Sequence, residues 1–252
     1  FLLLTLFSCS TTQYKAVGNK YMIATQGRYS TAAGEKIFAE GGNIIDVAAA
    51  ISFVISVERP QSTGIGGGGF MLFYNKKMTS PVAIDFRERA PSAAHSKMYL
   101  DKDGNEIKGK SLTGINAVGV PGLVAGILDV HKKYGKLNLT TILKPAIKLA
   151  EEGFEIYPEL DKALKYKKGD LALFPSSKKI FFKNGKVLKL GEFLVQKDLA
   201  ETLKLIAKNG HDGFYKGKVA DAIISAGNQI TQNDLDQYNV KYRKPIKGTY
   251  KD

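Results

Sequence analysis

The sequence contains a single cysteine, Cys9, and only three histidines among its 252 residues. One thiol cannot form a disulfide within the chain, and it cannot supply the cysteine pairs of a structural metal site. The histidines, at positions 95, 131 and 211, are far apart and form no His-x-x-x-His pair. We therefore expect no metal site, and no motif in the sequence calls for another cofactor.

The common signatures of nucleotide binding and of serine hydrolases are also missing. The glycine run at positions 64–69 is followed by no Gly-Lys-Ser/Thr, and residues 70–74 continue as a strand instead of opening a helix. The histidine spacing leaves a Ser-His-Asp triad open, but the sequence has no Gly-x-Ser-x-Gly elbow. These absences argue against nucleotide binding.

Acidic residues are scarce relative to basic ones, with 24 Asp and Glu against 37 Lys and Arg, which gives a net charge of +13. The excess is mostly lysine and is densest in residues 165–168 and 178–189. We interpret it as a solvated surface, because the nearby aromatic residues Phe181 and Phe182 fit a hairpin better than a base-stacking face. We expect no nucleic-acid partner, although the charge can raise the local concentration of acidic substrates.

The first seven residues are apolar and precede Ser8-Cys9-Ser10, a pattern typical of the end of a secretory signal peptide. Position 1 is not methionine, so we expect the natural start to lie upstream. Leu6-Phe7-Ser8-Cys9 resembles a lipobox, in which the cysteine becomes a lipidated N-terminus. We predict that residues 1–20 are a signal remnant, lipobox and linker, and that the protein is periplasmic or extracellular. Cys9 is the lipidation candidate. The alternatives are secretion without lipidation, and neither secretion nor lipidation.

No repeat and no linker rich in Pro, Gly or Ser divides the chain, which is long enough for one large domain or two small ones. Residues 47–57 are apolar on nearly every face, which predicts a buried helix, with a buried strand as the alternative. The hydrophobic pattern predicts helices over residues 30–40, 43–57, 121–134, 140–152, 198–209 and 219–226. It predicts strands over residues 21–25, 70–74, 82–86 and 111–120 and from 242, a hairpin turn at 184–185, and irregular structure with short helical pieces over 161–177.

Residues 60–91 combine the glycine run with two strand-like segments. Five glycines in six positions permit positive φ and close backbone approach, so the run could present N–H groups to an anion or let another strand lie against it. Arg87 leaves the second segment beside Asp85 and Glu88, and a guanidinium is a rigid fork of donors suited to a carboxylate. The stretch suggests a site for a small acidic molecule. The alternative is glycines used for packing and an arginine neutralised by Asp85 or Glu88.

An ordered series of motifs surrounds this stretch. It comprises Glu40-Gly-Gly-Asn43, Asp46-Val-Ala-Ala49, Gly64-Ile-Gly-Gly-Gly-Gly-Phe-Met71, Asp85-Phe-Arg-Glu88, Ala90-Pro91, Ala117-Val-Gly-Val-Pro-Gly122, Lys133-Tyr-Gly135, Gly153-Phe154 and Phe214-Tyr-Lys-Gly217. Together these motifs resemble the gamma-glutamyltranspeptidase family in its large-subunit half. The resemblance covers roughly Tyr21 to the last residue.

The resemblance implies an N-terminal-nucleophile hydrolase of the α/β (α+β) class, a four-layer αββα sandwich that is incomplete without the small subunit. In this family the precursor cleaves itself, and the new N-terminal threonine of the small subunit is the nucleophile, with its own α-amine as base. It attacks the γ-carbonyl of a γ-glutamyl amide such as glutathione. The resulting γ-glutamyl ester passes its acyl group to water, an amino acid or a dipeptide.

Carried over to this sequence, the resemblance makes Arg87 the arginine that binds the α-carboxylate of the γ-glutamyl group, and Glu88 the residue that orients it. The glycines are expected to pack layers and not to bind ligand. We expect no catalytic residue in the chain, because the family's nucleophile and oxyanion hole lie in the small subunit. Residues 21–252 are thus predicted to be a large-subunit part, truncated at its C-terminus, inactive alone and paired with the small subunit as a heterodimer. The alternatives are a related acylase, cephalosporin acylase-like or poly-γ-glutamate-cleaving, and a non-catalytic lipoprotein that kept the fold.

Overall fold

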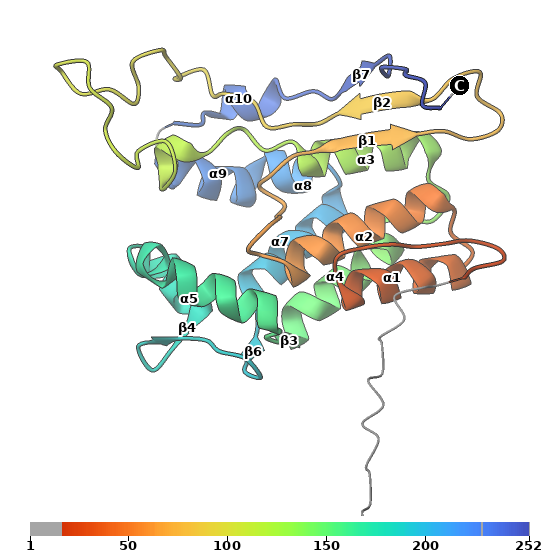
Figure 1. The fold of residues 1–252 in the computed structure, drawn as a ribbon, viewed down its shortest axis with the longest axis horizontal. Coiled ribbons are helices and arrows are strands. Elements are labelled where there is room, and N and C mark those ends of the chain that lie inside the picture. Colours follow the sequence, from red (N-terminus) through yellow and green to blue (C-terminus); the bar gives the residue numbers. More distant parts are fainter. Residues whose placement is uncertain (1–16, 228, 252) are drawn as a thin grey trace, which may run out of the picture.

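The computed structural model describes residues 17–227 and 229–251, in which packed helices lie against one side of a small antiparallel sheet (Figure 1). Cys9 and most of the predicted signal segment lie outside the described residues. Within the described ranges, no helix is both long enough and apolar enough to cross a membrane. The mixed helix-and-sheet class predicted from the sequence is confirmed.

The main sheet has the order β1–β2–β7 and is antiparallel throughout. It consists of β1 (Phe70–Phe73), β2 (Val82–Asp85) and β7 (Lys241–Arg243). Because side chains alternate along a strand, Phe73 and Ile84 point to one face, toward helix α3 (Leu123–Tyr134), where both are buried. The opposite face carries Phe70 and Leu72, which are 70% and 69% exposed. The sheet is therefore packed on one side only within the described residues.

Four helices form a closely packed group below this sheet. They are α1 (Arg28–Ala39), α2 (Ile44–Glu58), α4 (Leu139–Glu152) and α7 (Lys197–Asn209). Helix α2 packs against α1, α3 and α4, and α4 packs against α7. Ten of the fifteen residues of α2 are buried, which confirms the prediction of a helix that is apolar on nearly every face.

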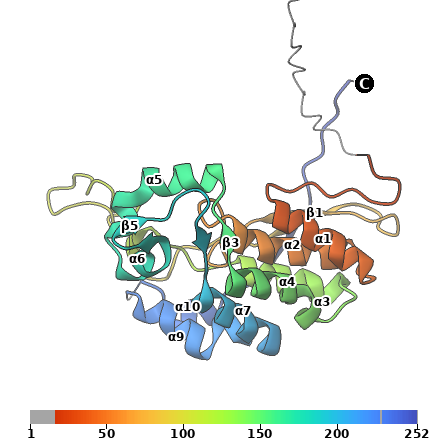
Figure 2. The ribbon, with the colours of Figure 1, turned by 90° about the horizontal axis from the view of Figure 1, so that it is seen from below.

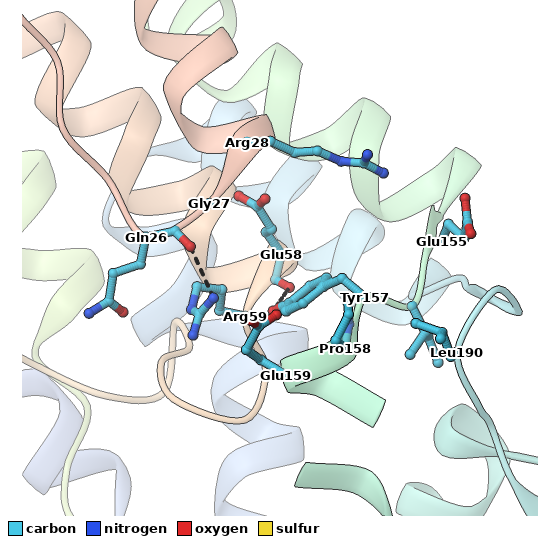
Figure 3. A pocket seen from close by; sticks show the side chains of 11 residues that line it. Gln26, Gly27, Arg28, Glu58, Arg59, Glu155, Tyr157, Pro158, Glu159 and Leu190 are labelled. Atoms are coloured by element: carbon cyan, nitrogen blue, oxygen red, sulfur yellow. Dashed lines mark hydrogen bonds between the residues drawn. The ribbon is translucent and has the colours of Figure 1, made fainter. Parts of the chain in front are cut away.

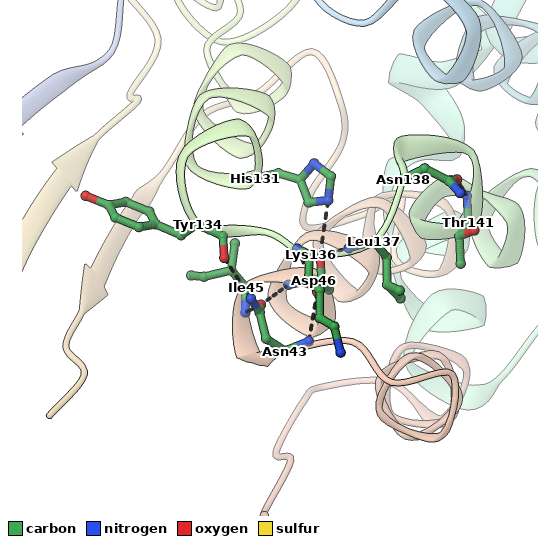
Figure 4. A network of polar contacts seen from close by, with 9 residues as sticks. All are labelled: Asn43, Ile45, Asp46, His131, Tyr134, Lys136, Leu137, Asn138 and Thr141. Atoms are coloured by element: carbon green, nitrogen blue, oxygen red, sulfur yellow. Dashed lines mark hydrogen bonds and ion pairs between the residues drawn. The ribbon is translucent and has the colours of Figure 1, made fainter. Parts of the chain in front are cut away.

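The N-terminus of α2 is tied to the loop between α3 and α4 by one buried carboxylate. Asn43 caps α2 and donates its own N–H to Asp46 Oδ2 at 2.8 Å, which completes a capping box. Asp46 also accepts hydrogen bonds from the N–H groups of Lys136 and Leu137 at 2.9 and 3.1 Å, and lies 3.2 Å from His131 Nε2 (Figure 4). Asp46 thus satisfies three backbone donors and fixes three helices relative to one another.

The C-terminal end of α2 holds the start of α1. Glu58 is 2% exposed, and its carboxylate accepts the N–H groups of Tyr29 and Ser30 at 3.0 and 2.9 Å. A carboxylate at a helix N-terminus satisfies unpaired donors and interacts favourably with the helix dipole. The prediction that Ser30 or Thr31 caps this helix is therefore wrong, because the helix begins one turn earlier, after Gly27, and takes its acceptors from α2.

The remaining elements extend these layers (Figures 1 and 2). Asn184 and Gly185 have φ of 52° and 75°, which is the two-residue hairpin turn predicted from Asn-Gly. The predicted helices at 121–134, 140–152, 198–209 and 219–226 are confirmed with small shifts in their bounds. The further elements are η1 (Ile115–Ala117), β3 (Phe154–Glu155), α5 (Pro158–Ala172), α6 (Pro175–Phe181), β4 (Phe182–Lys183), β5 (Lys186–Val187), β6 (Phe193–Leu194), α8 (Asp212–Tyr215), α9 (Gly217–Ser225) and α10 (Gln232–Asp236).

The strand predicted at residues 111–120 is not formed. Gly114 has a φ of 87° and turns the chain into the short helix η1, and this left-handed conformation cannot continue a strand. Only Val120 pairs, in an isolated bridge with Arg89. The strand predicted from residue 242 is correct only at its start, because β7 ends at Arg243.

Two further predictions, for residues 21–25 and 161–177, are wrong. Residues 21–25 form no strand, and the Tyr21 ring instead packs on Phe38 of α1, with ring centroids 4.3 Å apart. Residues 161–177, predicted to be irregular, are mostly helical in α5 and α6. Helix α5 buries only a narrow stripe that includes Leu160 and Leu164, so its polar composition conceals its helical pattern.

Candidate functional site

The chain leaves β2 through residues 85–89, and the glycine run lies directly against this segment. Gly69 and Phe86 exchange two backbone hydrogen bonds, of 3.2 and 3.0 Å, which extend the pairing of β1 with β2. A Cβ atom on Gly68 would lie 2.5 Å from the Phe86 carbonyl oxygen and 2.7 Å from the Glu88 nitrogen. Only glycine permits the two backbones to approach this closely.

The same run also anchors the start of α3. The carbonyl oxygen of Gly67 accepts hydrogen bonds from the N–H groups of Gly122 and Leu123 at 2.9 and 2.8 Å. The expectation that the run packs layers together is therefore confirmed at Gly67 and Gly68. A Cβ atom on Gly64 or Gly66 would meet nothing within 4 Å, so packing does not explain those two glycines.

Arg87 projects from this fixed backbone. Its N–H donates to Asp85 Oδ1 at 3.1 Å, and its side chain is 56% exposed. The guanidinium carbon lies 6.0 Å from the centre of the Phe70 ring, on the open face of the sheet. The Nε atom is 3.3 Å from Glu88 Oε2. Within the described residues neither Nη group has a hydrogen-bond acceptor, which leaves the outer edge of the fork available for a ligand carboxylate.

Glu88 lies in a narrow space between glycines. A Cβ atom on Gly119 would be 3.0 Å from Glu88 Cβ, and one on Gly67 would be 3.4 Å from Glu88 Oε1. Glu88 Oε2 is buried and receives no hydrogen bond from the described residues. The Nε atom of Arg87 is therefore the cation that compensates this carboxylate, and the contact constrains the direction of the Arg87 side chain.

Asp85 does not neutralise Arg87. Its Oδ2 atom lies 2.7 Å from Nη2 of Arg243 on the neighbouring strand β7, and accepts a hydrogen bond from Arg243 Nε at 2.8 Å. The Arg87 N–H and the Arg243 guanidinium lower the pKa of the Asp85 carboxyl below its ordinary value. Of the two partners that the sequence offered for Arg87, the structure selects Glu88.

Sequence reasoning missed two residues of this site, Arg243 and Tyr238. The Tyr238 hydroxyl donates a 2.8 Å hydrogen bond to the Arg87 carbonyl oxygen. Both residues lie about 150 positions after the segment that they contact, and neither belongs to a motif. No local signal could have identified them, since only the folded chain brings α10 and β7 beside β2.

A separate surface cavity of about 610 Å³ lies at the start of α1 (Figure 3). It is lined by Arg28, Arg59 and Tyr157 among others, and contains no residue of the glycine-rich stretch. The donors at the N-terminus of α1 are already bound to Glu58, so the protein's own carboxylate occupies the place of an anion. Over the described ranges, no group of three or more His, Cys, Asp or Glu side chains is placed to hold a metal ion.

The chain is similar to several known proteins in both sequence and structure. The chain is 40% identical to the glutathione hydrolase proenzyme of Bacillus subtilis over 248 residues, which is 96% of this chain and 42% of that protein. It superimposes on the crystal structure of Helicobacter pylori gamma-glutamyltranspeptidase with a TM-score of 0.89 and 42% identity, covering 93% of this chain and 69% of that one. It is also 36% identical to the acylase ACY 1 proenzyme of a Pseudomonas species, over 97% of this chain and 45% of that protein.

The fold is that of the N-terminal-nucleophile hydrolases, as expected from the sequence. The family model for gamma-glutamyltranspeptidase matches residues 30–252, and the chain belongs to this family. It spans about two fifths of the length of the Bacillus subtilis relative.

Proposed function

We propose that the complete protein is a γ-glutamyltransferase and glutathione hydrolase, and that this chain supplies the arginine that recognises its substrate. The observation that carries the proposal is the state of Arg87. Its main chain is fixed by packing against glycines, and its Nε contacts Glu88. Its guanidinium lies near the exposed Phe70 ring, and its two Nη groups have no acceptor among the described residues. This arrangement suits the α-carboxylate of a γ-glutamyl group.

In this proposal Arg87 binds the substrate carboxylate and positions the γ-glutamyl group, and Glu88 orients Arg87. A bidentate contact with the α-carboxylate fixes where the γ-carbonyl carbon, at which the acyl group is transferred, lies relative to the nucleophile. The nucleophile is a threonine of a small subunit, which forms a γ-glutamyl ester and releases the amine. Water or the amine of an amino acid or dipeptide then takes the acyl group and regenerates the threonine hydroxyl.

The open sheet face is the proposed contact surface for the small subunit. Phe70 and Leu72 are large, apolar and mostly exposed there, and an exposed apolar strand face is unusual for a surface left in water. A second sheet packed on this side would complete the αββα sandwich and place the nucleophile near Arg87. The proposed active protein is therefore a self-cleaved heterodimer.

We further propose that the protein acts outside the cytoplasm, anchored through Cys9 or released. The support is the apolar segment before Cys9 and its likeness to a lipobox. Labelling of the complete protein with a radioactive fatty acid in bacterial cells tests the anchor. Label in the wild type that is lost on Cys9→Ser supports lipidation, whereas equal label in both contradicts it.

The function is tested by expressing the complete reading frame that contains this chain and assaying glutathione and γ-glutamyl-p-nitroanilide. We expect cleavage of the precursor into two polypeptides and turnover of both compounds. The match to an acylase proenzyme makes the related acylase the second candidate. A cleaved protein that hydrolyses monoamides of dicarboxylic acids that lack the α-amino group, and leaves γ-glutamyl amides intact, would identify the acylase. An uncleaved and inactive protein would favour the non-catalytic lipoprotein.

A further inference from the structure

We infer that Tyr238 is a positioning residue for Arg87, and so contributes to recognition of the substrate carboxylate without touching the substrate. The inference rests on the proposed function, because it concerns the residue that holds Arg87 in place. It starts from one contact, the 2.8 Å hydrogen bond from the Tyr238 hydroxyl to the Arg87 carbonyl oxygen. The two residues are 151 positions apart in the sequence.

The ring of Tyr238 is held firmly enough to serve as a fixed point. Tyr238 is 6% exposed, and its ring stacks on that of Tyr215, with centroids 6.1 Å apart and planes inclined by 17°. The guanidinium of Arg89 lies 5.0 Å from the Tyr238 ring centre. Tyr215 is itself fixed, since its hydroxyl donates to the Pro121 carbonyl at 2.7 Å. The hydroxyl of Tyr238 is therefore presented from a packed aromatic pair.

The absence of a side chain at Gly122 leaves space for the Tyr238 hydroxyl. A Cβ atom on Gly122 would lie 2.1 Å from Tyr238 Oη and 2.2 Å from the Phe86 carbonyl oxygen. A side chain at position 122 would thus displace both the tyrosine and the segment that leads to Arg87. Gly122 also donates its N–H to Gly67, so the glycine run, the start of α3 and Tyr238 meet at one place.

These contacts restrain the main chain of Arg87 on both sides of its Cα atom. Its N–H donates to Asp85 and its carbonyl oxygen accepts from Tyr238. Among the described residues, the Arg87 side chain beyond Cβ is restrained only by Glu88 and by the Phe70 ring. The direction in which the half-exposed guanidinium points therefore depends on the main chain, and a displacement of a fraction of an ångström there is carried to the carboxylate-binding groups.

The test is Tyr238→Phe in the complete, self-cleaved protein. Its kinetics are measured with γ-glutamyl-p-nitroanilide and with the analogue whose α-carboxylate is a carboxamide. We expect kcat/KM for the free acid to fall about threefold to tenfold, the effect of losing one neutral hydrogen bond, with most of the change in KM. We expect the carboxamide to be turned over as by the wild type. Tyr157→Phe is the matched control, because its hydroxyl also donates to a main-chain carbonyl, that of Glu58 at 3.0 Å.

A double-mutant cycle separates positioning from general weakening of the fold. If Tyr238 acts through Arg87, Tyr238→Phe should have no further effect on KM in an Arg87→Ala background. An equal effect in both backgrounds, or wild-type discrimination between the two substrates in Tyr238→Phe, would overturn the inference and leave the proposed function intact. Failure of the wild type itself to prefer the free acid would instead overturn the role of Arg87, and the inference with it.

Discussion

Arg243 on β7 forms the ion pair with Asp85 at the end of β2, at 2.7 Å, and thereby leaves Arg87 without that carboxylate. The pair joins two neighbouring strands of the sheet on its open face. It also shows how an arginine two residues from an aspartate can remain available to a ligand. That aspartate is already bound to a cation from a distant strand.

This pairing predicts a pH dependence of stability. The pKa of the Asp85 carboxyl is lowered first by the Arg87 N–H and then by Arg243, so the ionised form is favoured in the folded state. The resulting stabilisation is present above the ordinary aspartate pKa of 3.8 and is lost as the pH falls through the lower folded value. We expect Asp85→Asn to have a lower urea midpoint than the wild type at pH 7, and the difference to shrink below about pH 3.8.

The control for this experiment is Asp221→Asn, on the exposed side of α9. We expect it to follow the wild type at both pH values. A difference between wild type and Asp85→Asn that is the same at pH 7 and pH 3 would show that the carboxylate charge does not stabilise the fold. In that case the ion pair with Arg243 would have no energetic role.

The close approach at Gly68 gives a second prediction. Gly68→Ala would place a methyl group 2.5 Å from one backbone atom and 2.7 Å from another, neither of which can move like a side chain. We expect the free energy of unfolding to fall by about 2 kcal/mol or more. Gly64→Ala is the matched control, since a Cβ atom there meets nothing within 4 Å, and it should change stability by less than about 1 kcal/mol. Equal unfolding midpoints for the two variants would refute the packing role of the run.

Asp46 gives a third prediction, on the helical layer. Asp46→Ala would leave three partly buried N–H groups without their acceptor, those of Asn43, Lys136 and Leu137. We expect a loss of about 3 kcal/mol or more, measured by denaturant unfolding. Asp212→Ala removes an exposed aspartate paired with Lys216 and should leave the unfolding midpoint close to that of the wild type. A small effect at Asp46 would mean that water replaces the carboxylate at these donors.

The sequence predicted those parts of the fold that local signals determine. The helix after Asn43 was predicted correctly because its apolar run is long enough to favour a helix over a buried strand. The strand expected at residues 111–120 failed because β-branched residues favour a strand only where a partner strand exists, and here only Val120 finds one, at Arg89. Helix α5 was missed because its buried face is narrow and its lysines dominate the composition.

The candidate site likewise contains residues that local sequence signals identify and residues that only the fold brings together. Arg87 was found because it lies within a recognisable motif, and Glu88 because it is adjacent. Their surroundings are made by Tyr238 and Arg243, whose positions depend on the path of the chain after α10. Hydrogen bonds that span about 150 residues leave no trace in the local pattern of a single sequence, so the residues that hold Arg87 could be identified only in the fold.

The central claim, that Arg87 recognises a substrate α-carboxylate, is tested most directly by Arg87→Ala in the complete protein. We expect KM for γ-glutamyl-p-nitroanilide to rise at least about tenfold, equivalent to about 1.4 kcal/mol, because a charge-assisted contact is lost. Arg87→Lys should recover only part of the loss, since an ammonium lacks the planar fork. The α-carboxamide analogue should be turned over equally by wild type and variant. Unchanged kinetics of Arg87→Ala with the free acid would contradict the account and remove Arg87 from the site.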